Sequence, residues 1–324
     1  MATTSTAPPP DRTIRVEHLS KSFGPVRAVD DLSFEVHPGR VTGFLGPNGA
    51  GKTTTLRMLL GLVRPTSGTA AIGGLAYHQI PRPLRTVGAA LEAASFHPGR
   101  TALDHLRTYA PQVGVPDARA AEVLEVVGLS GAAGRRVGGF SLGMRQRLGL
   151  ATTLLGDPQV LLLDEPANGL DPEGIRWLRE FLRTLAAQGR TVLVSSHVLS
   201  EVEQTVDDVV IIARGRLVHA STLAELARRA RPHVRVASPD TAGLAALVER
   251  AGWTRADDAR ADRGVELVDV DAAAVGAAAF AAGLELHELS TRDPGLEGLF
   301  LELVGGPAAG AADTATGTTR GAAA

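Results

Sequence analysis

Short apolar runs alternate with longer stretches that have the spacing of an amphipathic helix. Apolar runs of strand length lie at 40–45, 160–163 and 191–196, and helical spacing follows at 54–62 and 175–189. Apolar residues three and four positions apart predict a helix, whereas short continuous runs favour strands buried on both faces. The alternation therefore predicts an α/β fold with a parallel sheet.

Other patterns add elements around this predicted sheet. Residues 14–23 and 29–36 alternate enough to predict two antiparallel strands, and 206–220 fits a strand, a glycine turn and a second strand. Helical spacing at 121–131 and in the long stretch 140–156 predicts helices ahead of the apolar run that starts at Val160.

Composition changes along the chain predict its domain boundaries. Residues 1–12 are rich in Thr, Ala and Pro, which predicts a disordered leader, and the low-complexity segment 306–324 predicts a disordered tail. Residues 13–222 carry the α/β pattern. Residues 223–305 begin with a basic connector and then alternate strand-like and helix-like segments, so we expect a small accessory α/β domain there.

A glycine-rich loop, GPNGAGKTT, joins the first predicted sheet strand to a helix. Gly46, Gly51, Lys52 and Thr53 occupy the fixed places of the pattern G-x-x-x-x-G-K-[ST]. The backbone N–H groups of such a loop bind phosphate oxygens, the lysine adds a compact cation, and the threonine hydroxyl is free to bind Mg²⁺. The strand-loop-helix context favours this phosphate-binding loop over a chance glycine turn.

Two acidic residues follow the apolar run at 160–163. Carboxylates at the end of a buried strand are costly unless they bind a cation or accept hydrogen bonds, and in a parallel sheet that end faces the phosphate loop. We predict that Asp164 binds Mg²⁺ and that Glu165 orients or deprotonates water, with a capped strand end as the alternative. His197 follows the run at 191–196 and is predicted to lie beside the same site rather than to be purely structural.

Some residues have two interpretations on local sequence alone. Phe23 could stack on adenine or pack in the core. Ser141 could be a helix N-cap or part of an anion site at a helix start. Glu92 follows a short apolar strand and, taken alone, fits a solvated acid.

Composition excludes several classes of protein. The 324 residues are 44% hydrophobic, and 33 basic against 35 acidic residues give a net charge of −2, which does not indicate nucleic acid or an anionic membrane surface. The absence of cysteine excludes disulfides and thiolate metal sites and fits a reducing cytosol. The start of the chain has no signal-peptide pattern, and no run approaches the roughly 20 apolar residues that span a bilayer, so a membrane role needs a separate membrane subunit.

The motifs together resemble the ATP-binding subunits of ABC transporters, over about residues 12–224. GPNGAGKTT is similar to Walker A, VLLLDE to Walker B, NGLD at 168–171 to the D-loop, SSH to the switch-histidine segment, and FSLGMRQRLGLA at 140–151 to the signature usually written LSGGQ. The order and spacing of these motifs are more specific than any single one. The resemblance implies an α/β P-loop ABC-type nucleotide-binding domain, with a parallel-sheet core, an antiparallel β subdomain and a helical subdomain, followed by the accessory domain.

Two departures from the usual family motifs restrict the resemblance to one branch of the family. Leu142 replaces the first glycine of the signature and Met144 replaces its glutamine, while Ser141 and Gly143 remain. Glu92 stands where most members have glutamine, and its carboxylate could bind metal directly. These variants, and the segment DPGLEGLFLEL near the C-terminus, resemble the branch with bacitracin, daunorubicin and lantibiotic-immunity exporters.

The resemblance implies a role for each matching residue. Phe23 would stack on adenine, Glu165 would be the catalytic base, and His197 would contact the γ-phosphate. Thr53, Asp164 and Glu92 would organise Mg²⁺ and its waters. The residues that would hold the ATP phosphates are Gly46, Pro47, Asn48, Gly49, Ala50, Gly51, Lys52, Thr53 and Thr54. The signature residues that would act on ATP bound to the opposite subunit are Ser141, Leu142, Gly143 and Met144, and Asp171 would bridge the interface.

Because the chain has one phosphate loop and one signature, the resemblance implies that two chains sandwich two ATP molecules head to tail. The second ATP-binding subunit is expected to be a copy of this chain, with a mixed pair as the alternative. The loop around Glu92 and 96–106 would meet a transmembrane permease subunit. The expected function is ATP hydrolysis that drives export of antibiotic-like or lipid-like compounds, by a cytoplasmic subunit bound at the inner face of the cell membrane, with no nucleic-acid partner. The alternatives are an importer subunit, a soluble ABC ATPase acting on ribosomes or DNA, and a P-loop small-molecule kinase, which should lack the signature.

Overall fold

The computed structural model describes residues 11–91, 96–229, 233–255, 264–292 and 295–305. The predicted leader and tail, and Glu92, lie largely or wholly outside these ranges. The described chain divides into two compact units, the first extending to Leu223 and the second covering Ala224–Leu303. Among the described residues, none of the helices has the length and apolar character needed to cross a membrane.

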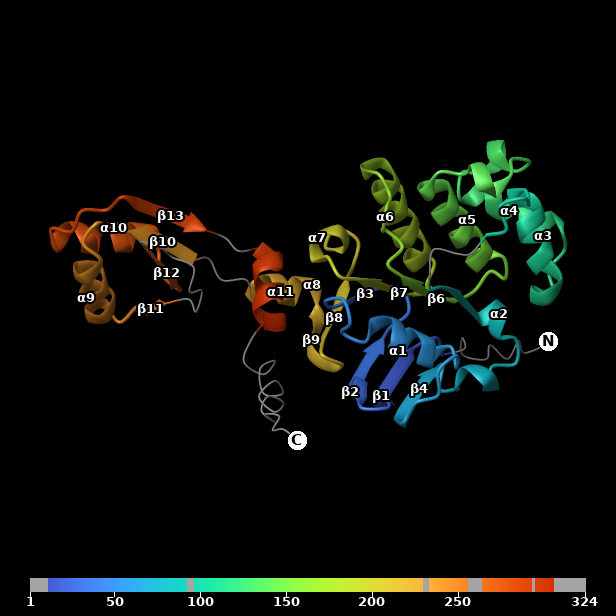
Figure 1. Ribbon diagram of the computed structural model, residues 1–324, viewed down its shortest axis with the longest axis horizontal. Helices are drawn as coiled ribbons and strands as arrows, with labels where there is room; N and C mark the ends of the chain where they lie inside the picture. Colours follow the sequence, from blue (N-terminus) through green and yellow to red (C-terminus); the bar gives the residue numbers. More distant parts are fainter. Residues whose placement is uncertain (1–10, 92–95, 230–232, 256–263, 293–294, 306–324) are drawn as a thin grey trace, which may run out of the picture. The chain divides into compact units, whose positions relative to one another are not determined.

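The central sheet of the first unit has six strands in the order β5, β6, β7, β3, β8, β9 (Figure 1). All neighbouring pairs are parallel except β8 and β9. Its strands are β3 (Val41–Leu45), β5 (Val87–Ala90), β6 (Val160–Asp164), β7 (Thr191–Ser196), β8 (Asp208–Ala213) and β9 (Arg216–Thr222). Every residue of β3 and β7 is buried, which is why both strands appear as continuous apolar or small-residue runs.

A smaller antiparallel sheet lies on the same unit, with the order β2, β1, β4. Its strands are β1 (Ile14–Phe23), β2 (Val26–Val36) and β4 (Ser67–Ile72). Helix α1 (Lys52–Leu59) contacts β2 and β4 of this sheet and also β6 of the central sheet. Side chains of both sheets and of α1 form one apolar core, so the helix that starts at the phosphate loop is held on two sides.

The remaining helices of the first unit are grouped by position. Helices α3, α4 and α5 contact one another and form a helical group, drawn in green in Figure 1. Their bounds are α3 (Ala102–Val113), α4 (Ala118–Val126) and α5 (Leu142–Leu154), and the other helices of this unit are α2 (Pro83–Thr86), α6 (Pro172–Ala187) and α7 (Leu199–Val202). Helix α8 (Leu223–Arg229) belongs to the second unit from Ala224 onward. The first residues of the predicted basic connector, ARRARPH, continue α8, because Leu, Ala, Glu and Arg favour a helix.

The second unit is a four-stranded antiparallel sheet with helices, in the strand order β11, β12, β10, β13. Its strands are β10 (His233–Ala237), β11 (Thr254–Arg255), β12 (Gly264–Val268) and β13 (Glu288–Arg292), and its helices are α9 (Thr241–Ala251), α10 (Ala272–Ala281) and α11 (Gly295–Gly305), whose last residues belong to the first unit. Val234, Val236, Leu244, Leu267 and Val275 form a separate apolar core. The predicted fold class is confirmed, including the α/β architecture of this accessory region.

Candidate functional site

The candidate site forms where three parallel strands end side by side. Leu45 pairs with Ser196, and Asp164 pairs with Ser195, so β3, β6 and β7 reach their carboxyl ends at the same level. In open α/β sheets this edge is where ligands bind. The topology therefore brings the glycine loop after Leu45, the acids at the end of β6 and the residues after β7 to one place.

The glycine loop has a backbone that side chains would obstruct. Gly49 and Gly51 have φ of 80° and 104°, a region that glycine adopts without strain. A Cβ at Gly46 would lie 2.3 Å from the carbonyl oxygen of Ile212, and one at Gly51 would lie 2.6 Å from that of Ala28. Helix α1 starts directly after Gly51, which has no side chain to cap it, so its first N–H groups face the loop and can bind an anion.

Lys52 lies between the loop and the acids. Its Nζ donates to the carbonyl oxygens of Gly46 at 2.6 Å and Pro47 at 3.3 Å, and it lies 3.6 Å from Glu165 Oε1. The side chain is only 5% exposed, and this burial lowers the pKa of Lys52, while the charge of Glu165 opposes the shift. A desolvated cation held by carbonyl dipoles is suited to receive phosphate oxygens.

Asp164 accepts hydrogen bonds on both carboxylate oxygens. Thr53 Oγ1 donates to its Oδ2 at 2.7 Å, and the hydroxyl of Ser195 donates to its Oδ1. The Thr53 hydroxyl and the Asp164 carboxylate are hard oxygen donors from two elements, which is the donor set that Mg²⁺ accepts together with water and phosphate oxygens. The residues present fit Mg²⁺, although the described residues include no cluster of three or more acidic, histidine or cysteine ligands.

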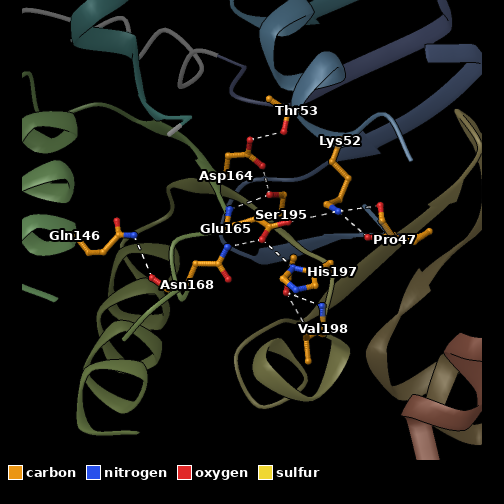
Figure 2. Close-up of polar contacts among 12 residues, drawn as sticks. Pro47, Lys52, Thr53, Gln146, Asp164, Glu165, Asn168, Ser195, His197 and Val198 are labelled. Atoms are coloured by element: carbon orange, nitrogen blue, oxygen red, sulfur yellow. Dashed lines mark hydrogen bonds and ion pairs between the residues drawn. The ribbon is translucent and has the colours of Figure 1, made fainter. Parts of the chain in front are cut away.

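Glu165 directly follows β6 and has an unusual backbone. Its φ is 48°, a left-handed conformation that is uncommon for residues other than glycine and tends to occur at functional sites. The Glu165 N–H lies 2.9 Å from Ser195 Oγ and 3.2 Å from the Ser195 carbonyl oxygen, so β7 holds this conformation. The turn directs the Glu165 side chain toward Lys52 and His197, as Figure 2 shows.

The Glu165 carboxylate receives donors from two loops. His197 Nδ1 lies 2.8 Å from Oε2, and because a carboxylate only accepts hydrogen bonds, Nδ1 carries the proton. The amide Nδ2 of Asn168 donates to the same oxygen at 2.6 Å. The structure thus brings together Lys52, Thr53, Asp164, Glu165 and His197, all of which the sequence placed at one site.

Other predicted residues lie on separate elements. Phe23 ends β1 with 51% of its surface exposed, so it is not a core residue, and Lys21 Nζ lies 4.9 Å from its ring centroid. Ser141 caps α5, since its Oγ accepts from the Met144 N–H at 3.3 Å, which confirms the capping interpretation and leaves the anion role as a prediction. Asp171 caps α6 through the Gly174 N–H at 2.8 Å.

The first residues of α5 also contact the loop after Glu165. Leu142 is 47% exposed, and its Cδ2 approaches Gly169 so closely that a Cβ at Gly169 would lie 2.0 Å from it. A Cβ at Gly143 would lie 3.5 Å from Leu170 Cδ2. The signature segment and the D-loop of the same chain are therefore packed together.

Three further residues support this site, and none of them was assigned a role from the sequence. Ser195 bonds both Asp164 and the Glu165 backbone, Asn168 bonds the Glu165 carboxylate, and Gln146 Nε2 donates to the Asn168 carbonyl oxygen at 3.3 Å. A signal for Ser195 was present, because polar residues at the end of an otherwise apolar strand need partners. Asn168 and Gln146 gave no such signal, since Asn in a turn is explained by local structure alone.

Comparison with known proteins gives matches across both units. The profile of a family described as ABC transporter matches residues 29–168, and that of a domain of unknown function (DUF8746) matches residues 232–297. The chain is 43% identical over 240 residues to the bacitracin transport ATP-binding protein BcrA of Bacillus licheniformis, covering 73% of this chain and 78% of that protein. It is 34% identical over 298 residues to BcrA of Enterococcus faecalis, covering 90% and 96%.

Further matches concern a lantibiotic transporter and a solved structure. The chain is 38% identical over 205 residues to the lantibiotic transport ATP-binding protein SrtF of Streptococcus pyogenes, covering 63% of this chain and 89% of that protein. A solved structure described as the ATP binding subunit of an ABC transporter matches with a TM-score of 0.60 and 30% identity, over 67% of this chain and 92% of that one.

Proposed function

This chain belongs to the ATP-binding subunits of ABC transporters and is an ATPase, and from that premise we propose that it powers export of antibiotic-like or lipid-like compounds through a separate membrane permease. The proposal on cargo is supported by the relatives that transport bacitracin and lantibiotics. We further propose that two copies act as a head-to-tail dimer at the inner face of the cell membrane.

The proposed mechanism is supported mainly by the register of the central sheet. Strands β3, β6 and β7 end side by side, so Lys52, Asp164 and Glu165 lie at the same edge of the sheet. In this mechanism the glycine loop and Lys52 bind the phosphates of ATP, and Phe23 stacks on adenine. Lys52 neutralises charge that builds on the phosphate oxygens. Glu92 stays a candidate for the metal site on sequence grounds.

Glu165 is the proposed general base. Its carboxylate takes a proton from the attacking water, the water oxygen bonds to the γ-phosphorus, and the bond from that phosphorus to the β,γ-bridging oxygen breaks, giving ADP and phosphate. His197 holds Glu165 through Nδ1, and when it donates toward the γ-phosphate its Nε2 carries a second proton. Thr53 and Asp164 would hold Mg²⁺, which when bound neutralises charge on the β- and γ-phosphates. Ser141 to Met144 and Asp171 act across the dimer interface.

Glu165→Gln tests the chemical part of this proposal. The substitution keeps the size of the side chain and removes the base, so phosphate release should fall at least about 100-fold while ATP still binds. With ATP and Mg²⁺ the variant should elute from gel filtration as a dimer. Glu180→Gln, an exposed residue of α6, is the matched control and should behave as wild type. Near wild-type turnover of Glu165→Gln would remove Glu165 as the base, and elution only as a monomer would refute the sandwich dimer.

The transport part has its own test. The tagged chain is purified from detergent-solubilised membranes and from cytosol, and its partners are identified by mass spectrometry. A multi-span protein in stoichiometric amount is expected in the membrane fraction. Cells that express the wild-type chain with that partner should tolerate more of a bacitracin-like peptide than cells with the Glu165→Gln variant. Recovery with ribosomes or DNA would contradict the transport proposal.

A further inference from the structure

Asn168 makes the shortest described hydrogen bond to the Glu165 side chain. Its Nδ2 donates to Oε2 at 2.6 Å, and the two residues are also joined through their backbones, since the Asn168 N–H lies 3.1 Å from the Glu165 carbonyl oxygen. The turn between β6 and α6 therefore folds the Asn168 amide back onto the carboxylate. Figure 2 shows this contact beside the one from His197.

The two donors on Oε2 leave the other carboxylate oxygen in a defined place. Glu165 Oε1 faces Lys52 Nζ at 3.6 Å, on the side of the glycine loop. A carboxylate can rotate about its last bond with little resistance, because terminal torsions of this kind have broad minima. The Asn168 amide and the His197 imidazole, both bonded to Oε2, oppose that rotation and keep Oε1 on the phosphate side.

Asn168 is in turn held by α5 of the same chain. Gln146 Nε2 donates to the Asn168 carbonyl oxygen at 3.3 Å, as the dashed line in Figure 2 shows. One residue further on, Gly169 has a φ of 73° and lies directly against the Leu142 side chain. The loop that carries Asn168 is thus attached to the first turns of α5 by one hydrogen bond and one close packing contact.

We propose that Asn168 is a positioning residue for the base, and that Gln146 ties that position to the signature helix of the same chain. The inference rests on the proposed role of Glu165. A displacement of α5 pulls on the Asn168 carbonyl, shifts the Asn168 amide, and releases or restores the orientation of the Glu165 carboxylate. The geometry of the base then depends on α5 within one subunit, in addition to any contact made across a dimer.

A purely structural role for Asn168 predicts a different outcome. Asn is favoured in turns for local reasons, so its replacement would lower stability and leave the turnover of folded protein unchanged. A positioning role instead lowers kcat with little effect on KM for ATP, because the residue contacts the base and not the described phosphate loop. Misplacement of a catalytic group by about 1 Å can cost about 100-fold in rate.

Steady-state ATP hydrolysis by the full chain separates the two roles. Asn168→Leu, which keeps the size and removes the donor, should lower kcat at least about tenfold and change KM less than about twofold. Asn168→Gln, which restores an amide on a longer side chain, should recover part of the lost kcat. An unchanged kcat in folded Asn168→Leu, judged by its thermal transition, would overturn the proposal, and so would a loss that appears only in KM.

Gln146 gives a second test, whose first part, Gln146→Ala alone, does not depend on the folding of an Asn168 variant. Gln146→Ala should lower kcat about threefold, and in an Asn168→Leu background it should have no further effect, because residues that act through one another are not additive. Gln188→Ala, at the exposed end of α6, is the matched control and should keep wild-type kinetics. Full additivity of the two substitutions would overturn the link to α5.

Glu165→Gln, measured in parallel, separates a failure of the base assignment for Glu165 from a failure of the positioning role for Asn168. If Glu165→Gln is inactive while both Asn168→Leu and Gln146→Ala are fully active, the base assignment holds and the positioning role is wrong. If Glu165→Gln retains turnover, the base assignment itself is wrong and the positioning role falls with it.

Discussion

His197 Nδ1 contacts Glu165 Oε2 at 2.8 Å although the two residues are 32 positions apart. Each residue directly follows a strand of the central sheet, Glu165 after β6 and His197 after β7, and these strands pair in parallel with Asp164 opposite Ser195. The contact is therefore a direct result of the sheet topology. It joins the proposed base to the residue proposed to donate a hydrogen bond to the γ-phosphate.

Replacing His197 tests whether this contact matters for chemistry. His197→Ala should lower kcat about 100-fold, the usual cost of losing one preorganised donor to the transition state, with a smaller change in KM for ATP. The measurement is phosphate release at saturating ATP. His287→Ala, an exposed histidine of the second unit, is the matched control. Wild-type kcat in His197→Ala would show that the histidine only packs beside Glu165.

Phe23 is expected to set nucleotide affinity. Base stacking on an aromatic ring contributes about 1–3 kcal/mol, so Phe23→Ala should raise KM for ATP about tenfold and leave kcat within about twofold. Phe280, which is 88% exposed in the second unit, provides a control, since Phe280→Ala removes an exposed aromatic ring elsewhere. Equal KM values in the two variants would contradict adenine stacking on Phe23.

Two glycine substitutions should have opposite effects on stability. Gly46→Ala places a Cβ 2.3 Å from the Ile212 carbonyl oxygen, so the loop must shift, and both ATP affinity and the thermal transition should fall. Gly149→Ala, inside α5, meets no atom within 4 Å and should raise the free energy of unfolding by about 1 kcal/mol. Calorimetry of both variants checks the pair, and a stabilised Gly46→Ala would contradict the described loop.

His105 predicts how stability depends on pH. Its side chain is 4% exposed in α3, its Nδ1 has no hydrogen-bond partner among the described residues, and burial followed by the charge of Arg100 lowers its pKa to about 4. Thr152 Oγ1 lies 3.3 Å from Nε2 and itself donates to the Leu148 carbonyl oxygen, which implies that Nε2 carries the single proton. A second proton on Nδ1 would bury an unpaired charge.

The sign of the effect follows from proton linkage. An unfolded histidine binds a proton below about pH 6.5, whereas folded His105 does so only near pH 4, so the unfolded state binds more protons in between and stability falls as pH falls through this window. His105→Leu removes this term. Between pH 7.5 and pH 5 the unfolding free energy of wild type should therefore fall by about 2 kcal/mol more than that of the variant, as measured by urea denaturation. An equal pH dependence in both proteins would contradict a neutral buried His105.

The sequence alone predicted those parts of the site that depend on local pattern and on strand topology. The glycine loop is a local pattern, and Asp164, Glu165 and His197 each follow an apolar run whose parallel pairing makes their meeting expected. The bond from Asn168 to Glu165 was not predictable in this way. It depends on the φ of 48° at Glu165, which a non-glycine residue adopts only when the surrounding structure holds it.

The position of α5 against the D-loop and the exposure of Phe23 were also not predictable from the sequence, because both depend on contacts between elements. No pattern in the signature segment indicates that Leu142 packs on Gly169, because that contact depends on the path of a loop with no secondary structure of its own. For Phe23 the local sequence allowed both core packing and exposure, and only the pairing of β1 with β2 decides that the ring lies at an exposed strand end.

Because Lys52 is buried, the rate at which its amine is acylated depends on the opening of the phosphate loop. Lys21 and Lys52 are the only lysines of the chain, and Lys52 is 5% exposed, with its Nζ bonded to loop carbonyl oxygens. An acylating reagent therefore meets few targets, among which Lys52 reacts only when the loop opens. The rate at which Lys52 is labelled, followed by peptide mass, would time the opening of the phosphate loop without a dye, a cysteine substitution or a labelled nucleotide.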